Sequence, residues 1–330
     1  MTIKIFNTKR QVLFIGCLIL LGSQNSVKSQ LTEKRFNKDL NYLFYLPETY
    51  GNDTTKKWPL ILFLHGGGER GDDLSKVKAN GPPRLIARGK KIPFIVVSPQ
   101  IPLEAFWDPD LLVSMLRYII INYRVDEERV YLTGLSIGGL GTWQTAQKYP
   151  EMFAAIAPVS GWGDPLQLWK IRHTPVWIFH GAKDPVVPVI ASSVMADTLK
   201  QYDNVELTIY PKGGHDKWNE TYDNAKLYEW FLNHKRFRFE QTDLKGLPEK
   251  YTGLFSSGND TVTIFQVKNK LWIRYGYRGS RESLLKPSSD NAFFLHENEL
   301  TEIRYNINSD GVLTSFVFYD DLRKTYLRIN

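Results

Sequence analysis

The stretch Val130-Tyr131-Leu132-Thr133-Gly134-Leu135-Ser136-Ile137-Gly138 decides the expected fold. An apolar run of strand type leads into the pattern Gly-x-Ser-x-Gly, and a run able to form a helix follows it. This context is typical of a nucleophile elbow, in which a serine occupies a tight turn between a strand and a helix. A serine that merely caps a helix is the alternative, but the preceding strand favours the elbow.

Ser136 needs a base because a serine hydroxyl is a weak nucleophile. His215 is the candidate, since it lies in a glycine-containing loop directly after the last strand-like run of the first 240 residues. Asp184, also just after a strand-like run, is the expected acid that orients His215. Asp164 and Asp216 are the alternatives for the acid. The chain order serine, aspartate, histidine is the one found in α/β-hydrolases.

An acyl-transfer site also needs two preorganised N–H groups for the oxyanion. Ile137, the residue after the serine, is expected to supply one of them. The second is expected from Gly67, with Gly68 as the alternative, in the loop His65-Gly66-Gly67-Gly68-Glu69-Arg70-Gly71 that follows a continuous apolar run.

Residues 1–29 have the pattern of a secretory signal peptide. A positively charged start precedes the apolar run Gln11–Gly22, and the small residues Val27 and Ser29 stand before an expected cleavage at Gln30. The sequence therefore predicts export to the periplasm or the extracellular space. Twelve apolar residues are fewer than the roughly 20 needed to span a bilayer, so no stable membrane insertion is expected.

A lipoprotein anchored through Cys17 is the less favoured alternative, because Phe14-Ile15-Gly16 is a poor lipobox and apolar residues continue beyond it. Cys17 is the only cysteine in the chain. A mature chain that starts at Gln30 would therefore have no disulfide, no cysteine nucleophile and no cysteine metal ligand. We expect no metal and no organic cofactor, because the predicted chemistry needs neither.

The net charge of +7 does not indicate a nucleic-acid partner. Four of the 42 basic residues lie in positions 1–29, which contain no acidic residue. Without that segment, 38 basic residues face 35 acidic ones, so the net charge is only +3. No dense run of Lys and Arg forms the basic patch that nucleic-acid binding requires.

Two domains are expected after the signal peptide. Strand-like and helix-like runs alternate through residues 30–240, which predicts a mostly parallel sheet with helices on both faces. Residues 246–330 contain short alternating runs and no long helical stretch, which predicts a small antiparallel β domain of 85 residues without catalytic residues.

We expect the aromatic side chains of this β domain to form its core rather than an exposed sugar-binding face, and the domain to serve as a lid, spacer or dimer surface. The chain gives no signal for its oligomeric state. The aromatic residues in question are Phe265, Trp272, Tyr275, Tyr277, Phe316 and Phe318.

These motifs, together with His180-Gly181-Ala182-Lys183-Asp184 and Gly214-His215-Asp216-Lys217-Trp218, resemble bacterial α/β-hydrolases of the carboxylesterase, feruloyl-esterase-like and predicted-peptidase group. That group is related to dienelactone hydrolases and prolyl oligopeptidases. The resemblance covers about residues 38–236 and implies the α/β-hydrolase fold. Dienelactone hydrolases use a cysteine nucleophile, whereas Ser136 fits the esterases.

The resemblance implies an exported serine carboxylesterase that forms an acyl-enzyme. Trp107, Trp162 and Trp218 lie near the expected site and are predicted to bind substrate, since aromatic faces suit sugars and phenolic acyl groups. Acetyl or feruloyl esters on plant polysaccharide are therefore the favoured substrates. A serine peptidase of the prolyl oligopeptidase type is one alternative, although the chain lacks room for the large propeller of those enzymes. An inactive binding protein on a hydrolase scaffold is the other.

Overall fold

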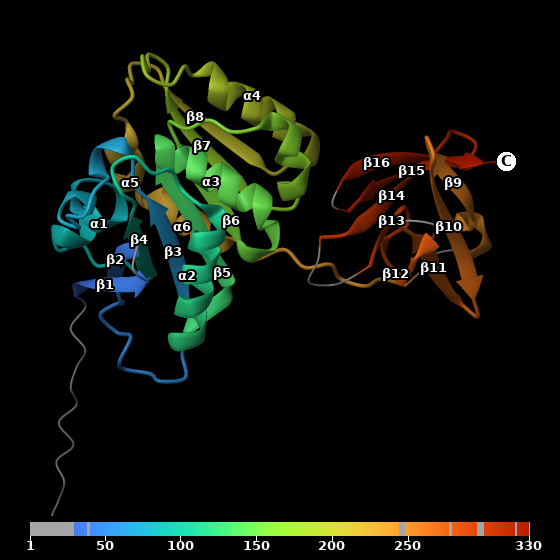
Figure 1. Ribbon diagram of the computed structural model, residues 1–330, viewed down its shortest axis with the longest axis horizontal. Helices are drawn as coiled ribbons and strands as arrows, with labels where there is room; N and C mark the ends of the chain where they lie inside the picture. The colour runs from blue at the N-terminus through green and yellow to red at the C-terminus, as the bar shows by residue number, and fades with distance from the viewer. Residues whose placement is uncertain are drawn as a thin grey trace, which may run out of the picture.

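The computed structural model describes residues 30–37, 40–243, 248–276, 279–295, 300–320 and 322–329. The predicted signal peptide, Tyr277 and His296 lie outside the described residues. Within them, two sheets account for the strands: an eight-stranded open sheet and a closed eight-stranded barrel (Figure 1).

The open sheet has the order β1-β2-β4-β3-β5-β6-β7-β8. β1 and β2 are antiparallel to their neighbours, and the pairs from β4 through β8 are parallel. The strands are β1 (Leu31–Asn37), β2 (Leu40–Tyr45), β3 (Trp58–Leu64), β4 (Ile95–Gln100), β5 (Val125–Leu135), β6 (Ala155–Val159), β7 (Val176–Gly181) and β8 (Val205–Tyr210).

Helices cover both faces of this sheet, because successive side chains of a strand point to opposite faces. On β3, Leu60 and Leu62 face one apolar core, and Ile61 and Phe63 face the other. Side chains of α2, α3 and α4 complete the first core, and those of α1, α5 and α6 complete the second. The helices are α1 (Gly81–Ala87), α2 (Pro109–Asn122), α3 (Ile137–Lys148), α4 (Ile190–Leu199), α5 (Trp218–Asp223) and α6 (Ala225–Asn233).

The C-terminal sheet is an antiparallel barrel in which each strand pairs with the next and β16 closes onto β9. The predicted fold class, an α/β-hydrolase sheet followed by a small antiparallel β domain, is thereby confirmed. The barrel strands are β9 (Gly253–Ser257), β10 (Asp260–Val267), β11 (Lys270–Tyr275), β12 (Arg281–Ser289), β13 (Ala292–Phe294), β14 (Glu302–Ile307), β15 (Leu313–Tyr319) and β16 (Arg323–Ile329).

Only part of the predicted aromatic set fills the barrel. Phe316 and Phe318 are buried in the core, and Tyr275 packs against it. Phe265 and Trp272 are half-buried and pair across β10 and β11. Because Ile264 and Ile273 point inward, the period of two turns their neighbours Phe265 and Trp272 outward. The prediction of a core position was therefore wrong for these two residues.

A buried ion cluster joins the barrel to the hydrolase domain. The guanidinium of Arg172 donates to Glu302 Oε1 through Nε at 2.7 Å and to the Leu300 carbonyl through Nη2. Arg304 Nε donates to the same Glu302 oxygen at 2.9 Å, and His173 Nε2 lies 3.4 Å from it. The side chains of Arg172 and Glu302 are each only 1% exposed.

The barrel attaches at the edge of the sheet where parallel strands begin. Arg172 and His173 directly precede β7, and Asp184 follows the other end of that strand. A strand of six residues spans about 20 Å. The barrel therefore joins the molecule far from the carboxyl ends of the strands, which does not support the predicted role as a lid.

Replacing Glu302 by Gln should weaken this junction strongly. The change leaves Arg172 buried without its charged partner, which typically costs about 3–5 kcal/mol. We expect a lower urea midpoint for Glu302→Gln. The control is Glu282→Gln, whose pair with Arg274 is about half exposed and should contribute less than about 1 kcal/mol. Equal urea midpoints for Glu302→Gln and Glu282→Gln would contradict the conclusion that Glu302 stabilises the junction between the two domains.

The same cluster predicts a pH dependence. Burial raises the pKa of Glu302, but the contacts with His173 and Arg172 outweigh burial and lower it to about 2. On acidification the unfolded chain takes up this proton first, so the contribution of Glu302 is present above about pH 4.5 and is lost as the pH falls towards 2. Urea midpoints of the wild type and Glu302→Gln should converge over that range.

Candidate active site

Ser136 occupies a strained turn between β5 and α3. Its backbone has φ 54° and ψ −118°, a region that non-glycine residues rarely adopt. The turn is held by the Ser136 N–H, which donates to the Val159 carbonyl at 2.9 Å. The predicted strand–serine–helix arrangement is therefore present, with the side chain at the tip of the turn.

The flanking glycines are required because backbone from β3 packs against the turn. A Cβ on Gly138 would lie 2.1 Å from the Leu64 carbonyl oxygen, and a Cβ on Gly134 would lie 2.4 Å from the Gly138 carbonyl oxygen. No side chain fits at either position, so the two glycines bring α3 close to β3 and β5.

The structure brings the three expected residues together. His215 Nε2 lies 2.9 Å from Ser136 Oγ, and His215 Nδ1 lies 2.7 Å from Asp184 Oδ2. Since a carboxylate only accepts, Nδ1–H donates to Asp184 and the hydroxyl of Ser136 donates to Nε2. Of the two alternative acids, Asp164 accepts from Leu166 N–H at the start of a short 3₁₀ helix, and Asp216 is exposed.

Asp184 is buried and hydrogen-bonded at both oxygens. Oδ1 accepts from the N–H groups of Val186 and Val187 at 2.8 and 2.9 Å, while Oδ2 accepts from His215. Burial raises the pKa of Asp184, but the hydrogen bonds from His215, Val187 and Val186 outweigh burial and lower it. The acid therefore stays ionised and can stabilise a positive charge on His215.

The loop after β3 is held by a buried histidine that sequence reasoning did not assign. His65 Nδ1–H donates to the Gly66 carbonyl at 2.6 Å, and Nε2 accepts from Ile101 N–H at 3.2 Å. Burial lowers the pKa of His65 to about 4, so the ring is neutral near pH 7 and can make both bonds. The position of His65 directly before the glycines was the available signal.

At Gly66 a Cβ would lie 2.5 Å from the end of the Leu135 side chain, which would have to move to accept it. At Gly67 a Cβ would meet only Arg70 Nη2, at 3.6 Å. Arg70 donates to the carbonyls of Gly67 and Ala105, and so ties the loop to the segment before α2. Opposite it, Ile137 is the first residue of α3, where a helix leaves its N–H without an internal acceptor.

The three tryptophans predicted to bind substrate occupy different environments. Trp107 is only 4% exposed, donates to the His65 carbonyl and packs on Gly141. Its ring is buried between the loop after β3 and α3, so it does not form the predicted pocket wall. Trp218 is half-buried, with its ring edge-on to His215 at 5.2 Å. Trp162 is also half-buried, just after β6.

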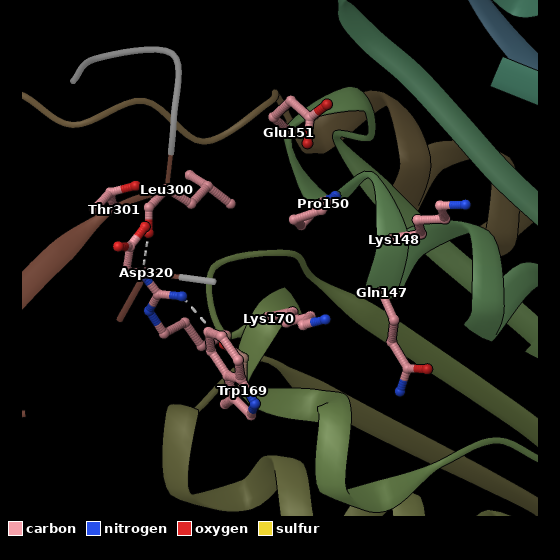
Figure 2. Close-up of a pocket in the computed structure, with 10 residues that line it drawn as sticks. Gln147, Lys148, Pro150, Glu151, Trp169, Lys170, Leu300, Thr301 and Asp320 are labelled. Atoms are coloured by element: carbon pink, nitrogen blue, oxygen red, sulfur yellow. Dashed lines mark hydrogen bonds between the residues drawn. The ribbon is translucent and has the colours of Figure 1, made fainter. Parts of the chain in front are cut away.

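A cavity of about 420 Å³ lies elsewhere, between the hydrolase domain and the barrel (Figure 2). Gln147 and Lys148 at the end of α3, Trp169, and Thr301 of the barrel segment line it. The twelve residues of α3 separate this cavity from Ser136 by about 18 Å. It is therefore distinct from the site built around Ser136.

No group of three or more His, Cys, Asp or Glu residues in the described part of the chain is arranged to hold a metal ion. No described helix combines the length and apolar character needed to cross a membrane.

Several known proteins are similar to this chain in sequence or in structure. Residues 112–229 match the phospholipase/carboxylesterase family. A poly(3-hydroxyoctanoate) depolymerase of Pseudomonas fluorescens is 27% identical over 210 residues, 54% of this chain and 74% of the depolymerase. Feruloyl esterase B of Talaromyces funiculosus is 42% identical over 155 residues, 46% of this chain and 39% of that enzyme. The crystal structure of a thermostable esterase is similar with a TM-score of 0.55 and 30% identity, covering 63% of this chain and 64% of that one.

The chain thus contains an α/β-hydrolase domain. Within that class the chain is similar to carboxylic ester hydrolases: the matching family and these relatives are esterases or depolymerases. The matches span less than two thirds of the feruloyl esterase and of the thermostable esterase.

Replacing Gly138 by Ala should destabilise the hydrolase domain by about 3 kcal/mol or more, because the new methyl group would collide with backbone that cannot turn aside. The control is Gly68→Ala, since a Cβ at Gly68 meets nothing within 4 Å and should change stability by less than about 0.5 kcal/mol. Thermal unfolding followed by tryptophan fluorescence measures both. Similar melting temperatures would contradict the close approach of β3 and α3.

Proposed function

We propose that the protein is a serine carboxylesterase that works through an acyl-enzyme. The observation that carries the proposal is the continuous hydrogen-bonded series from Ser136 through His215 to Asp184. In the first half-reaction Ser136 Oγ attacks the acyl carbon while His215 Nε2 takes its proton. His215 then delivers that proton to the leaving alcohol, and water hydrolyses the acyl-enzyme with His215 again acting as base.

The positions of the other residues around Ser136 and His215 indicate their roles. Asp184 orients His215 and stabilises its charged form. The N–H groups of Ile137 and Gly67 hold the oxyanion, one from the start of α3 and the other from the loop that His65 and Arg70 support. The side chain of His215 is 17% exposed, so solvent and substrate reach the site. A water molecule from the solvent can therefore attack the acyl-enzyme as the second nucleophile.

For the substrate we propose acetyl or feruloyl esters on plant polysaccharide, hydrolysed after export from the cell. The similarity to a feruloyl esterase supports the acyl group, and the half-buried rings of Trp162 and Trp218 supply aromatic surface near the serine. A polymer-linked ester also suits a site that the barrel does not cover. The two domains, residues 30–240 and 246–330, would then divide catalysis from an accessory role.

Ser136→Ala should lower the turnover of p-nitrophenyl acetate by roughly 10⁴-fold or more, because it removes the nucleophile. His215→Ala should cost a similar factor, while both variants keep the wild-type melting profile. Labelling of the wild type but not of Ser136→Ala by a fluorophosphonate gives an independent reading. Turnover close to wild type in Ser136→Ala would refute the proposal.

The substrate is tested with an ester panel of acetyl xylan, methyl ferulate, poly(3-hydroxyoctanoate) and p-nitrophenyl esters of increasing chain length. We expect the highest kcat/KM on acetyl or feruloyl esters. Highest activity on long acyl chains or on the polyhydroxyalkanoate would overturn the polysaccharide assignment. Faster cleavage of a peptide amide than of every short ester would instead identify a peptidase.

A further inference from the structure

His180 is a second histidine beside the proposed acid, and the mechanism above does not use it. It lies in β7, four residues before Asp184, and its side chain is completely buried. His180 Nε2 is 2.8 Å from the Val187 carbonyl oxygen and 3.2 Å from Asp184 Oδ2. The same carboxylate oxygen accepts from His215, so two imidazole rings converge on Asp184.

The partners of His180 define its tautomer. A carbonyl oxygen can only accept, so Nε2 must carry the hydrogen that points to Val187. His180 Nδ1 lies 2.7 Å from Ser192 Oγ, on α4. In the tautomer with Nε2–H, Nδ1 has no hydrogen, so the hydroxyl of Ser192 donates to Nδ1 rather than to the Gly161 carbonyl, which is 3.5 Å away. Ser192 thus keeps Nε2–H directed at the turn that carries Asp184.

This turn is what positions Asp184. The Val187 residue whose carbonyl accepts from His180 also donates its own N–H to Asp184 Oδ1, at 2.9 Å. Fixing Val187 therefore fixes one donor to Oδ1. His180 Nε2, which carries the hydrogen, also lies 3.2 Å from Asp184 Oδ2, so its N–H places a positive dipole beside that oxygen.

We propose that His180 is a positioning residue of the active site: it clamps the turn from Asp184 to Val187, with its tautomer set by Ser192. The inference rests on the proposed function, because it assigns His180 a role through Asp184. Losing the clamp lets the carboxylate move, which weakens its hold on His215. The loss should appear in the chemical step and leave substrate binding intact.

Two amide replacements separate the two ring nitrogens. In His180→Gln the side-chain amide nitrogen can take the place of Nε2 and still donate to Val187. In His180→Asn the shorter side chain reaches only the place of Nδ1, beside Ser192, and the donor to the turn is lost. Both replace the ring by an uncharged amide, so each serves as the matched control for the other.

We expect His180→Asn to lower kcat for p-nitrophenyl acetate by roughly 10- to 100-fold, the scale of loss that follows when a catalytic group is misplaced by about 1 Å, with KM within about twofold. His180→Gln should stay within about threefold of wild type. The acidic limb of the kcat/KM profile should move to lower pH in His180→Asn, because a carboxylate that is no longer held in place stabilises the charged form of His215 less. The control is His234→Asn, directly after α6, where the histidine ring hydrogen-bonds only to the Trp230 carbonyl among the described contacts; this variant should match the wild type.

Each outcome decides between the two proposals. Equal, wild-type-like kcat in the Gln and Asn variants, with Ser136→Ala inactive, would overturn the role of His180 and leave the esterase mechanism standing. Equal losses of kcat in both variants, with an unshifted profile and a lowered melting temperature, would show that His180 only packs the core and would also overturn it. Wild-type turnover that does not depend on Ser136 would instead refute the proposed function itself.

Discussion

The close approach of α3 to β3 and β5 is the constraint on which the site depends. Where Gly138 passes the Leu64 carbonyl, the space left is too small for a single methyl group. The chain can therefore pass from strand to helix only through a tight turn, and Ser136 takes the strained backbone that this turn demands. The strain is compensated by the hydrogen bond to Val159 and by burial of the two apolar cores on either side of the sheet.

Parallel pairing then decides which loops meet that turn. The carboxyl ends of β3, β5, β7 and β8 lie along one edge of the sheet. The loops after these strands bring His65, Ser136, Asp184 and His215 to that edge, although Ser136 and His215 are 79 residues apart in the chain. Each of these loops is held by its own contacts: His65 and Arg70 for the first, and the N–H groups of Val186 and Val187 for the loop that carries Asp184.

The barrel is built on a different principle. In its closed antiparallel sheet every strand pairs with two neighbours, and the sheet encloses its own aromatic core. Among the described residues, the buried ion cluster forms a junction with the hydrolase domain. That junction centres on a buried carboxylate, Glu302, which has several cationic or imidazole neighbours. Removing either Arg172 or Glu302 would leave the other as a buried charge without its main partner. The position at the amino ends of the strands leaves the edge with Ser136 uncovered.

The sequence by itself determined the fold class and the three residues that converge at the site. It could do so because each of these motifs depends on local chemistry. Glycines in the elbow and in the loop after β3 leave room for closely packed backbone, and a helix starts directly after Ser136. Asp184 and His215 are polar residues that come just after apolar strands. Alternation of side chains likewise predicted the buried positions of Phe316 and Phe318.

Only the tertiary structure decided what depends on register and on packing between distant segments. It turned Phe265 and Trp272 outward, because strand register fixes which alternate residues face the barrel core. It buried Trp107 against the loop after β3, and it put the barrel at the edge of the sheet away from Ser136. His180 shows the same limit: in the sequence it is one more buried strand residue, and its contacts with Val187 and Ser192 exist only once β7 and α4 have packed together.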